Sequence, residues 1–320
     1  MIVAVAVLVP AGIVLPHVLP LERVAPVTAA VLWACALALR ALTVIFAAIY
    51  LVFFLPATGL FGALTRWCLH AVVPLLSAHV GISGHALAAA AMVVPGLLLA
   101  ASIALAGFGV ARAARAVRRV LSRNTVALVA SDVLVVGGPD VLVAAAGLAR
   151  PRLVVSTGAL AQLDDEELAA GLDHERGHIA RRHRYVLVAA EFSRAVGRPV
   201  PGCARAVEQL AFHLERDADR WALRQRHDRL ALASAICKAA TTRGTQSPSF
   251  AALGGGGIAE RLDQLTGAVK PVARRTSATV NALAVALVTL TITAALTVPV
   301  ALQAGARTLQ QVERVHHCPT

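Results

Sequence analysis

The sequence predicts an α-helical membrane protein with about four transmembrane helices and an inserted α+β domain. The chain has 320 residues, of which 58% are hydrophobic. Its mean hydropathy of +0.70 is too high for an ordinary soluble enzyme. Several apolar runs are long enough to cross a bilayer, which takes about 20 helical residues. Between the third and the fourth of these runs, the chain changes to short β-type runs and amphipathic helices.

Three predicted spans precede the inserted domain and one follows it. Each span is a predominantly apolar run, and the domain between them carries most of the charged residues. We therefore expect one polar domain held between membrane helices. The predicted regions are a transmembrane region over 1–111 with spans at about 2–16, 36–58 and 86–111, a domain over 112–275, a fourth span over 279–302, and a short tail over 303–320.

Two prolines and one arginine decide where the first two spans lie. Pro16 and Pro20 are expected to end the first helix, since proline cannot continue the helical hydrogen bonding. Arg40 would cost about 2.5–3.5 kcal/mol at mid-bilayer. If the bilayer takes residues from about 40 onward, Arg40 lies at the headgroups and most of this cost disappears. The alternative is that Arg40 faces an internal active-site cavity.

The formal charge of +12 comes almost entirely from arginine, and the basic residues gather beside the apolar runs. By the positive-inside rule, this places the domain in the cytoplasm of a multi-pass plasma-membrane protein. Contact with anionic lipid headgroups explains these clusters. Direct nucleic-acid binding is not expected, because aromatic residues make up only 4% of the chain. The residues that flank the domain are Arg112, Arg115, Arg118, Arg119, Arg123, Lys270, Arg274 and Arg275.

A small β-sheet is predicted at the start of the domain. Four short β-type runs, separated by glycine-containing turns, lie at 125–130, 132–136, 141–146 and 152–156. We expect this sheet to pack against the helix that follows. An exposed edge could bind an extended peptide by strand addition. The alternative is an ordinary hairpin with no such role.

The pattern His174-Glu175-Arg176-Gly177-His178 (H-E-x-x-H) lies in the helix predicted after this sheet, from 164 to about 194. Asp164 and Glu167 have the spacing of a capping box, which fixes the start of that helix. Histidines four apart share a helix face and can bind one zinc ion. Glu175 can then accept a proton from a zinc-bound water. The alternative is an exposed charged helix with two incidental histidines.

A catalytic zinc site uses three protein ligands, so one more is needed. The predicted helix at 203–227 offers Glu215 and Asp219, which are four apart and share a face beside its apolar stripe. His213 and Asp217 fall off that face. We expect Glu215 to bind zinc and Asp219 to accept the free N–H of a ligand histidine. The alternative is a solvated acidic turn balanced by Arg216 and Arg220.

The chain resembles a known group of membrane proteases in four segments that occur in the same order. The resemblance is to the BlaR/MecR-type membrane zinc metallopeptidases, and more distantly to the HtpX and CAAX prenyl protease group. It implies a zincin-like fold of the gluzincin type, with His174, His178 and Glu215 as zinc ligands and Glu175 as base. About eighteen residues follow the fourth predicted span, so we expect no penicillin-binding sensor domain. The segments are Arg150–Gly158 (RPRLVVSTG), Leu163–Leu168 (LDDEEL), His174–His178 (HERGH) and Glu215–Asp219 (ERDAD).

The sequence therefore predicts a membrane-embedded, zinc-dependent endopeptidase. Its substrate would be a cytoplasmic or membrane-associated protein or peptide, and the resemblance implies a transcriptional repressor in a signalling pathway as a candidate. The alternative is a non-catalytic membrane signalling scaffold with a structural zinc. A purely structural site usually has four protein ligands. Only three good ones are found here, together with Glu175, which favours the enzyme.

Overall fold

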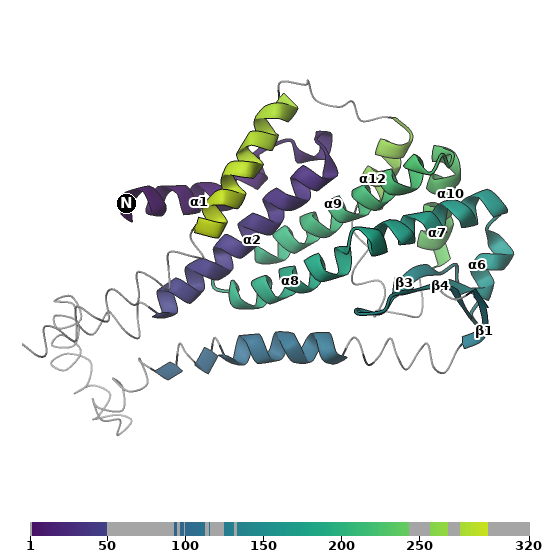
Figure 1. Ribbon diagram of the computed structural model, residues 1–320, viewed down its shortest axis with the longest axis horizontal. Coiled ribbons are helices and arrows are strands. Elements are labelled where there is room, and N and C mark those ends of the chain that lie inside the picture. The colour runs from purple at the N-terminus through teal and green to yellow at the C-terminus, as the bar shows by residue number, and fades with distance from the viewer. Residues whose placement is uncertain are drawn as a thin grey trace, which may run out of the picture.

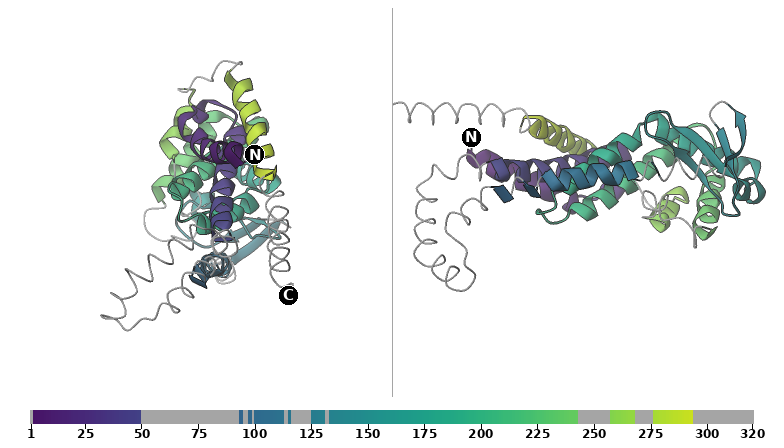
Figure 2. Two further views of the ribbon diagram at one scale, coloured as in Figure 1. Left: turned by 90° about the vertical axis from the view of Figure 1, so that its left-hand side faces the viewer. Right: turned by 90° about the horizontal axis from the view of Figure 1, so that it is seen from below.

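The computed structural model describes residues 2–49, 93–94, 97–98, 100–112, 115, 125–130, 133–242, 257–267 and 276–293. The molecule is elongated, with the N-terminal helices at one end and a small sheet at the other (Figure 1). Helices α7, α8 and α9 run between these two ends, and Figure 2 shows the same division from two further directions.

The described part of the chain is mostly helical. The helices are α1 (Ile2–Val18), the short 3-10 helix η1 (Leu21–Arg23), α2 (Pro26–Ile49), α6 (Thr157–Gln162), α7 (Asp165–Ala180), α8 (His183–Val196), α9 (Cys203–Arg224), α10 (Arg229–Thr242) and α12 (Ile258–Leu265). Two further apolar helices cover Ala100–Arg112 and Thr276–Thr293. The strands are β1 (Thr125–Ala130), β2 (Val133–Val136), β3 (Val143–Ala146) and β4 (Arg152–Ser156).

The four predicted strands form one sheet in the order β1-β2-β4-β3. Strands β1 and β2 are antiparallel, β2 and β4 are parallel, and β4 and β3 are antiparallel. Helix α7 packs against β3 at the edge, which confirms the prediction that the sheet lies against the H-E-x-x-H helix. The edge next to that helix is therefore the backbone of β3.

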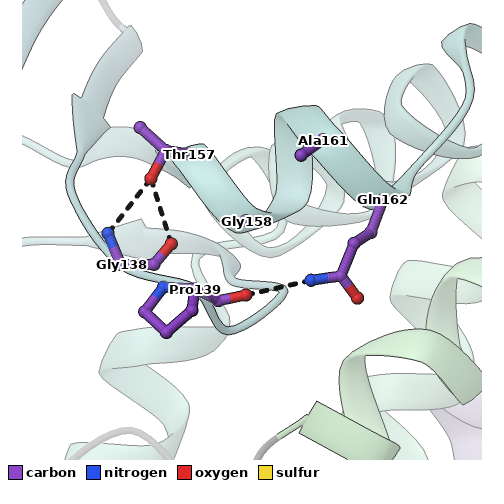
Figure 3. A pocket seen from close by; sticks show the side chains of 6 residues that line it. All are labelled: Gly138, Pro139, Thr157, Gly158, Ala161 and Gln162. Atoms are coloured by element: carbon purple, nitrogen blue, oxygen red, sulfur yellow. Dashed lines mark hydrogen bonds between the residues drawn. The ribbon is translucent and has the colours of Figure 1, made fainter.

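Hydrogen bonds join the turn between β2 and β3 to α6 (Figure 3). The Thr157 hydroxyl donates to the Gly138 carbonyl and accepts from the Gly138 N–H, while the Gln162 amide donates to the Pro139 carbonyl. A Cβ at Gly158 would lie 2.1 Å from the Pro139 oxygen, so only glycine allows this approach. These residues line a shallow surface depression that includes none of the predicted site residues.

Among the described residues, two helices are long and apolar enough to cross a membrane, α2 and Thr276–Thr293. Ala100–Arg112 is apolar but shorter. The predicted spans at 36–58, 86–111 and 279–302 each continue outside the described residues, and the tail over 303–320 lies entirely outside them. In the apolar 18-residue stretch of α2, 44% is buried inside the protein, against 17% in the stretch of Thr276–Thr293. Helix α2 is therefore partly a core helix as well.

The prediction that Pro16 and Pro20 end the first helix is wrong for Pro16, whereas the helix does end before Pro20. Helix α1 continues to Val18 with both Pro10 and Pro16 inside it. A proline removes one backbone hydrogen bond, and neighbouring helices can hold such a helix together. Gly12 shows how closely they approach, since a Cβ there would lie 2.5 Å from Leu287 and 2.8 Å from Leu39.

Arg40 lies neither at a lipid-facing surface nor in the predicted site. It is 1% exposed, and the turn between α8 and α9 covers it. Its Nε donates to the Pro201 carbonyl, Nη1 to the Ala36 carbonyl, and Nη2 contacts His17 Nε2 at 3.0 Å. The cost of burying this charge is thus offset by polar partners within the protein. Arg40 joins the α8–α9 turn to the N-terminal helices.

The predicted long helix from 164 to about 194 is two helices. The capping box of Asp164 and Glu167 is confirmed at the start of α7, which ends at Ala180. Arg182 then adopts a left-handed conformation with φ of 57°, and α8 begins at His183. The polar run Arg181-Arg182 offers no local sign of a break, because arginine is a good helix former. Helix α9 also ends earlier than predicted, at Arg224.

The left-handed residue at the α7–α8 junction should tolerate glycine and reject a β-branched residue. We expect Arg182→Val to lower the stability by about 1–2 kcal/mol, since a Cβ is strained there. Arg182→Gly should leave the thermal midpoint Tm unchanged or raise it. The measurement is thermal unfolding of the detergent-solubilised protein. A destabilised Arg182→Gly protein alongside a stable Arg182→Val protein would show that this junction is an ordinary helix.

Candidate metal centre

Helix α7 presents its two motif histidines to helix α9, because the two helices pack closely at Gly177. A Cβ at Gly177 would lie 2.9 Å from Trp221 Cβ and 3.0 Å from Trp221 Cγ. Glycine at this position lets the α7 backbone lie directly against α9. Glu215 is six residues before Trp221, on the same helix. The close contact therefore brings Glu215 up to the histidines.

Three of the predicted site residues meet at this crossing. His174 Nε2 lies 3.2 Å from His178 Nε2. His174 Nε2 also lies 3.4 Å from Glu215 Oε2, and His178 Nε2 lies 3.4 Å from Glu215 Oε1. All three side chains are at least four-fifths buried. Among the described residues, these three form the group of His, Cys, Asp or Glu side chains that could hold a metal ion.

The donor atoms fit zinc. A tetrahedral zinc ion with bonds of about 2.0–2.1 Å would hold its ligand atoms about 3.3–3.4 Å apart. The two histidine nitrogens lie 3.2 Å apart, and each lies 3.4 Å from a different oxygen of the Glu215 carboxylate. Two imidazoles and one carboxylate also leave the fourth position of the tetrahedron open, as in catalytic rather than structural zinc sites.

The cluster has the electrostatics of a cation site. Burial opposes ionisation of Glu215, but the neighbouring histidines and Arg261 outweigh it and hold its pKa well below its usual range. Burial also opposes a charge on His174, yet Asp219 and Glu215 raise its pKa to about 10. Burial lowers the pKa of His178 to about 3. The buried carboxylates therefore favour a positive charge in the cluster, and a metal ion would supply that charge.

Asp219 lies on the far side of His174 from the donor atoms. His174 Nδ1 is 2.9 Å from Asp219 Oδ1, although this contact is off the direction of a linear hydrogen bond. The spacing of four residues that places Glu215 and Asp219 on one face thus brings both to the same imidazole. Glu215 approaches its Nε2 and Asp219 its Nδ1.

Sequence reasoning missed Arg261, which comes from α12 and completes the cluster. Its Nε and Nη2 donate to the two oxygens of Asp219 at 2.9 and 2.7 Å, and its Nη1 lies 2.9 Å from Glu215 Oε2. Arg261 is 5% exposed. Its separation of 42 residues from Asp219 left no local pattern to find it by. The only available indication was that two buried carboxylates require a cation.

Sequence reasoning also missed His183, and it set aside Asp217. His183 Nδ1 lies 3.0 Å from His178 Nδ1, and His183 Nε2 lies 3.3 Å from Asp217 Oδ2. Asp217 points to this second histidine and away from Glu215, as its rotation on α9 requires. His213 is fully buried elsewhere, with its Nδ1 2.9 Å from Arg216.

Glu175 lies between α7 and the edge of the sheet. Its Oε2 accepts a hydrogen bond of 2.7 Å from the N–H of Ala145 in β3. It follows His174 directly in α7. Burial opposes the charge of Arg261, which pairs with Glu215, but the carboxylates near it, including that of Glu175, raise its pKa. A carboxylate in this place can accept a proton from a group held between the cluster and β3.

The sequence model of peptidase family M48 matches residues 110–198. The matched range contains the sheet, α7 with its two histidines and α8, and it ends before α9. No curated protein and no solved structure matches the chain. The match is a similarity over less than a third of the chain and suggests a metallopeptidase; the members of family M48 are zinc enzymes. The mostly helical chain with its small sheet fits a zincin-like domain.

Loss of Arg261 should destabilise the metal-free protein more than the zinc-loaded protein. Arg261→Leu leaves the buried carboxylates of Asp219 and Glu215 without their cation, and breaking a buried ion pair costs about 3–5 kcal/mol. Zinc on Glu215 would replace part of that missing charge. Thermal unfolding with and without zinc measures both effects.

The matched control is Arg176→Leu, whose half-exposed ion pair with Asp173 should contribute less than about 1 kcal/mol. Equal stability of metal-free Arg261→Leu and wild-type protein would contradict the role given to Arg261 in the cluster.

Proposed function

We propose that this chain is a membrane-embedded, zinc-dependent endopeptidase. The observation that carries the proposal is the convergence of His174, His178 and Glu215, whose polar groups lie 3.2–3.4 Å apart. Helix α7, which supplies the two histidines, also carries Glu175. The match to family M48 supports a metallopeptidase. The zinc ligands would be the two histidines and Glu215. Bound zinc would act as a Lewis acid on a peptide carbonyl and lower the pKa of water.

Glu175 is the proposed general base. Its carboxylate accepts the proton of the attacking water and can deliver it to the leaving amine, which is the usual dual role of such a group. The Ala145 N–H fixes the position of this carboxylate. Arg261 holds Glu215 ionised, and Asp219 lies against the Nδ1 of His174. These contacts hold the side chains of the cluster in place.

The substrate is proposed to bind as an additional strand along β3. In an antiparallel pair, successive residues alternate between bonding the partner and facing away. Ser156 N–H bonds the Leu142 carbonyl, so the alternation turns the backbone groups of Val143 and Ala145 away from β4. The Ala145 N–H bonded to Glu175 agrees with this direction. Because the Ala145 N–H already holds Glu175, an extended peptide would pair with other backbone groups of this edge and would pass beside the base.

A cytoplasmic or membrane-associated protein is the proposed substrate class. The layout in Figure 1 supports it, since the sheet with β3 lies at the end of the molecule opposite α1. Within this class, the resemblance to the BlaR/MecR-type proteases makes a transcriptional repressor our candidate. The plasma membrane is the proposed location, with the peptidase domain in the cytoplasm.

Glu175→Gln should retain zinc and lose peptidase activity. The amide preserves the shape of the side chain but cannot accept a proton, so we expect the cleavage rate to fall by at least about 10²-fold. The assay is zinc-dependent cleavage of casein by the purified full-length protein, with bound zinc measured on the same samples.

Asp173→Asn is the matched control for this variant. It makes the same carboxylate-to-amide change on the same helix, but Asp173 bonds Arg176 and His227 instead of the cluster. Its activity should stay near that of wild type. Near-normal cleavage by Glu175→Gln would remove Glu175 from the role of base. A wild-type protein that holds zinc without cleaving protein would favour the non-catalytic scaffold.

The proposed orientation makes a separate prediction for reporter fusions. Basic residues flank the domain on both sides, which favours the cytoplasm. Alkaline phosphatase, which is active only outside the cytoplasm, should be active when fused after residue 310 and inactive when fused near residue 240. A green fluorescent protein fusion at each site is the control and should give the opposite result. The reverse pattern would overturn the orientation.

A further inference from the structure

His183 and Asp217 form a second polar pair behind the metal cluster, on the side of His178 that faces away from Glu215. Both are 3% exposed. His183 Nδ1 lies 3.0 Å from His178 Nδ1, and the two rings meet edge to face at 84° with centroids 4.9 Å apart. The other nitrogen of His183, Nε2, lies 3.3 Å from Asp217 Oδ2.

The chemistry of these groups fixes the direction of each hydrogen bond. An ionised carboxylate can only accept, so the proton between His183 and Asp217 belongs to His183 Nε2. A neutral imidazole then has its lone pair on the other nitrogen, so His183 Nδ1 accepts. His178 Nδ1 must therefore donate, which leaves the lone pair of His178 on Nε2. That is the nitrogen 3.4 Å from Glu215 Oε1.

We propose that His183 and Asp217 are positioning residues that fix the tautomer and the ring orientation of His178 for metal binding. The inference rests on the metal-ligand role proposed above for His178. It gives the second ligand histidine an orienting carboxylate, as Asp219 does for His174. The difference is that Asp217 acts on His178 through an intervening imidazole.

The surroundings of Asp217 support its part in this relay. Arg181 Nε lies 3.5 Å from Asp217 Oδ2. The carboxylate thus lies between His183 and a guanidinium, both of which carry N–H donors, and it can only accept from them.

The break between α7 and α8 is what brings His183 to His178. In a continuous helix, a residue five positions on is rotated by about 140° and its side chain faces elsewhere. The left-handed conformation of Arg182 interrupts the helix, so that the His183 ring contacts the ring of His178 instead. The strained residue and the relay are thus parts of one local arrangement.

The experiment measures zinc affinity of the full-length protein by competition with a chromogenic chelator. His183→Phe keeps a ring and removes both nitrogens, and we expect it to weaken zinc binding by about 10–100-fold, as is usual for partners of ligand histidines. The absorption spectrum of the cobalt-substituted protein should also shift. The matched control is His213→Phe, a buried histidine on α9 outside the cluster, whose zinc affinity should equal that of wild type.

Asp217 provides a second test that does not depend on how His183→Phe folds. Asp217→Asn keeps an acceptor oxygen and should retain most of the affinity, whereas Asp217→Leu should lose about 10–100-fold. Because the two residues act in series, the double variant His183→Phe/Asp217→Leu should bind zinc no more weakly than the weaker single variant.

Three results would overturn the relay while leaving the proposed function intact. They are wild-type affinity in His183→Phe, equal affinities of Asp217→Asn and Asp217→Leu, and fully multiplicative losses in the double variant. A wild-type protein that binds no zinc contradicts the proposed function itself, and the relay with it. Because the readout is metal binding, loss of peptidase activity alone cannot be mistaken for failure of the relay.

Discussion

The close contact between α7 and α9 is the constraint on which the site depends. At Gly177 there is no room for a Cβ, because Trp221 occupies the space. This contact lets a carboxylate of α9 come within 3.4 Å of both motif histidines, although 37 residues or more of sequence separate them. A wider separation of the helices would leave two histidines with no third donor. The packing of α7 against α9 thus decides which side chains make up the cluster.

Helix α9 supplies carboxylates on more than one face, and each face serves a different partner. Glu215 faces the Nε2 atoms of His174 and His178, Asp219 faces His174 Nδ1, and Asp217 faces His183. Burying three carboxylates on one helix would be unfavourable without cations. Arg261 offsets the charge of two of them, and Arg181 approaches the third.

The same helix is also part of the core that holds the N-terminal helices. The first half of α9 packs against α2 through Cys203, Ala206, Leu210 and Leu214. Directly after Glu215, the guanidinium of Arg216 donates to the backbone carbonyls of Leu21, Glu22 and Val24 in the turn between α1 and α2. The turn between the first two apolar helices is therefore held one residue away from Glu215. The candidate metal centre and the apolar bundle share one framework.

Features that depend on neighbours along the chain could be predicted from the amino-acid sequence. The capping box of Asp164, the four strands, and the shared face of Glu215 and Asp219 all follow from spacing of a few residues. Other features became visible only in the folded chain: the break at Arg182, the approach of His183 and Asp217, the ion pairs of Arg261 and the burial of Arg40. Local periodicity carries no information about partners 23 to 195 residues away. Those contacts form because a buried charge is unfavourable unless it is paired with an opposite charge or hydrogen-bonded to a carbonyl inside the folded chain.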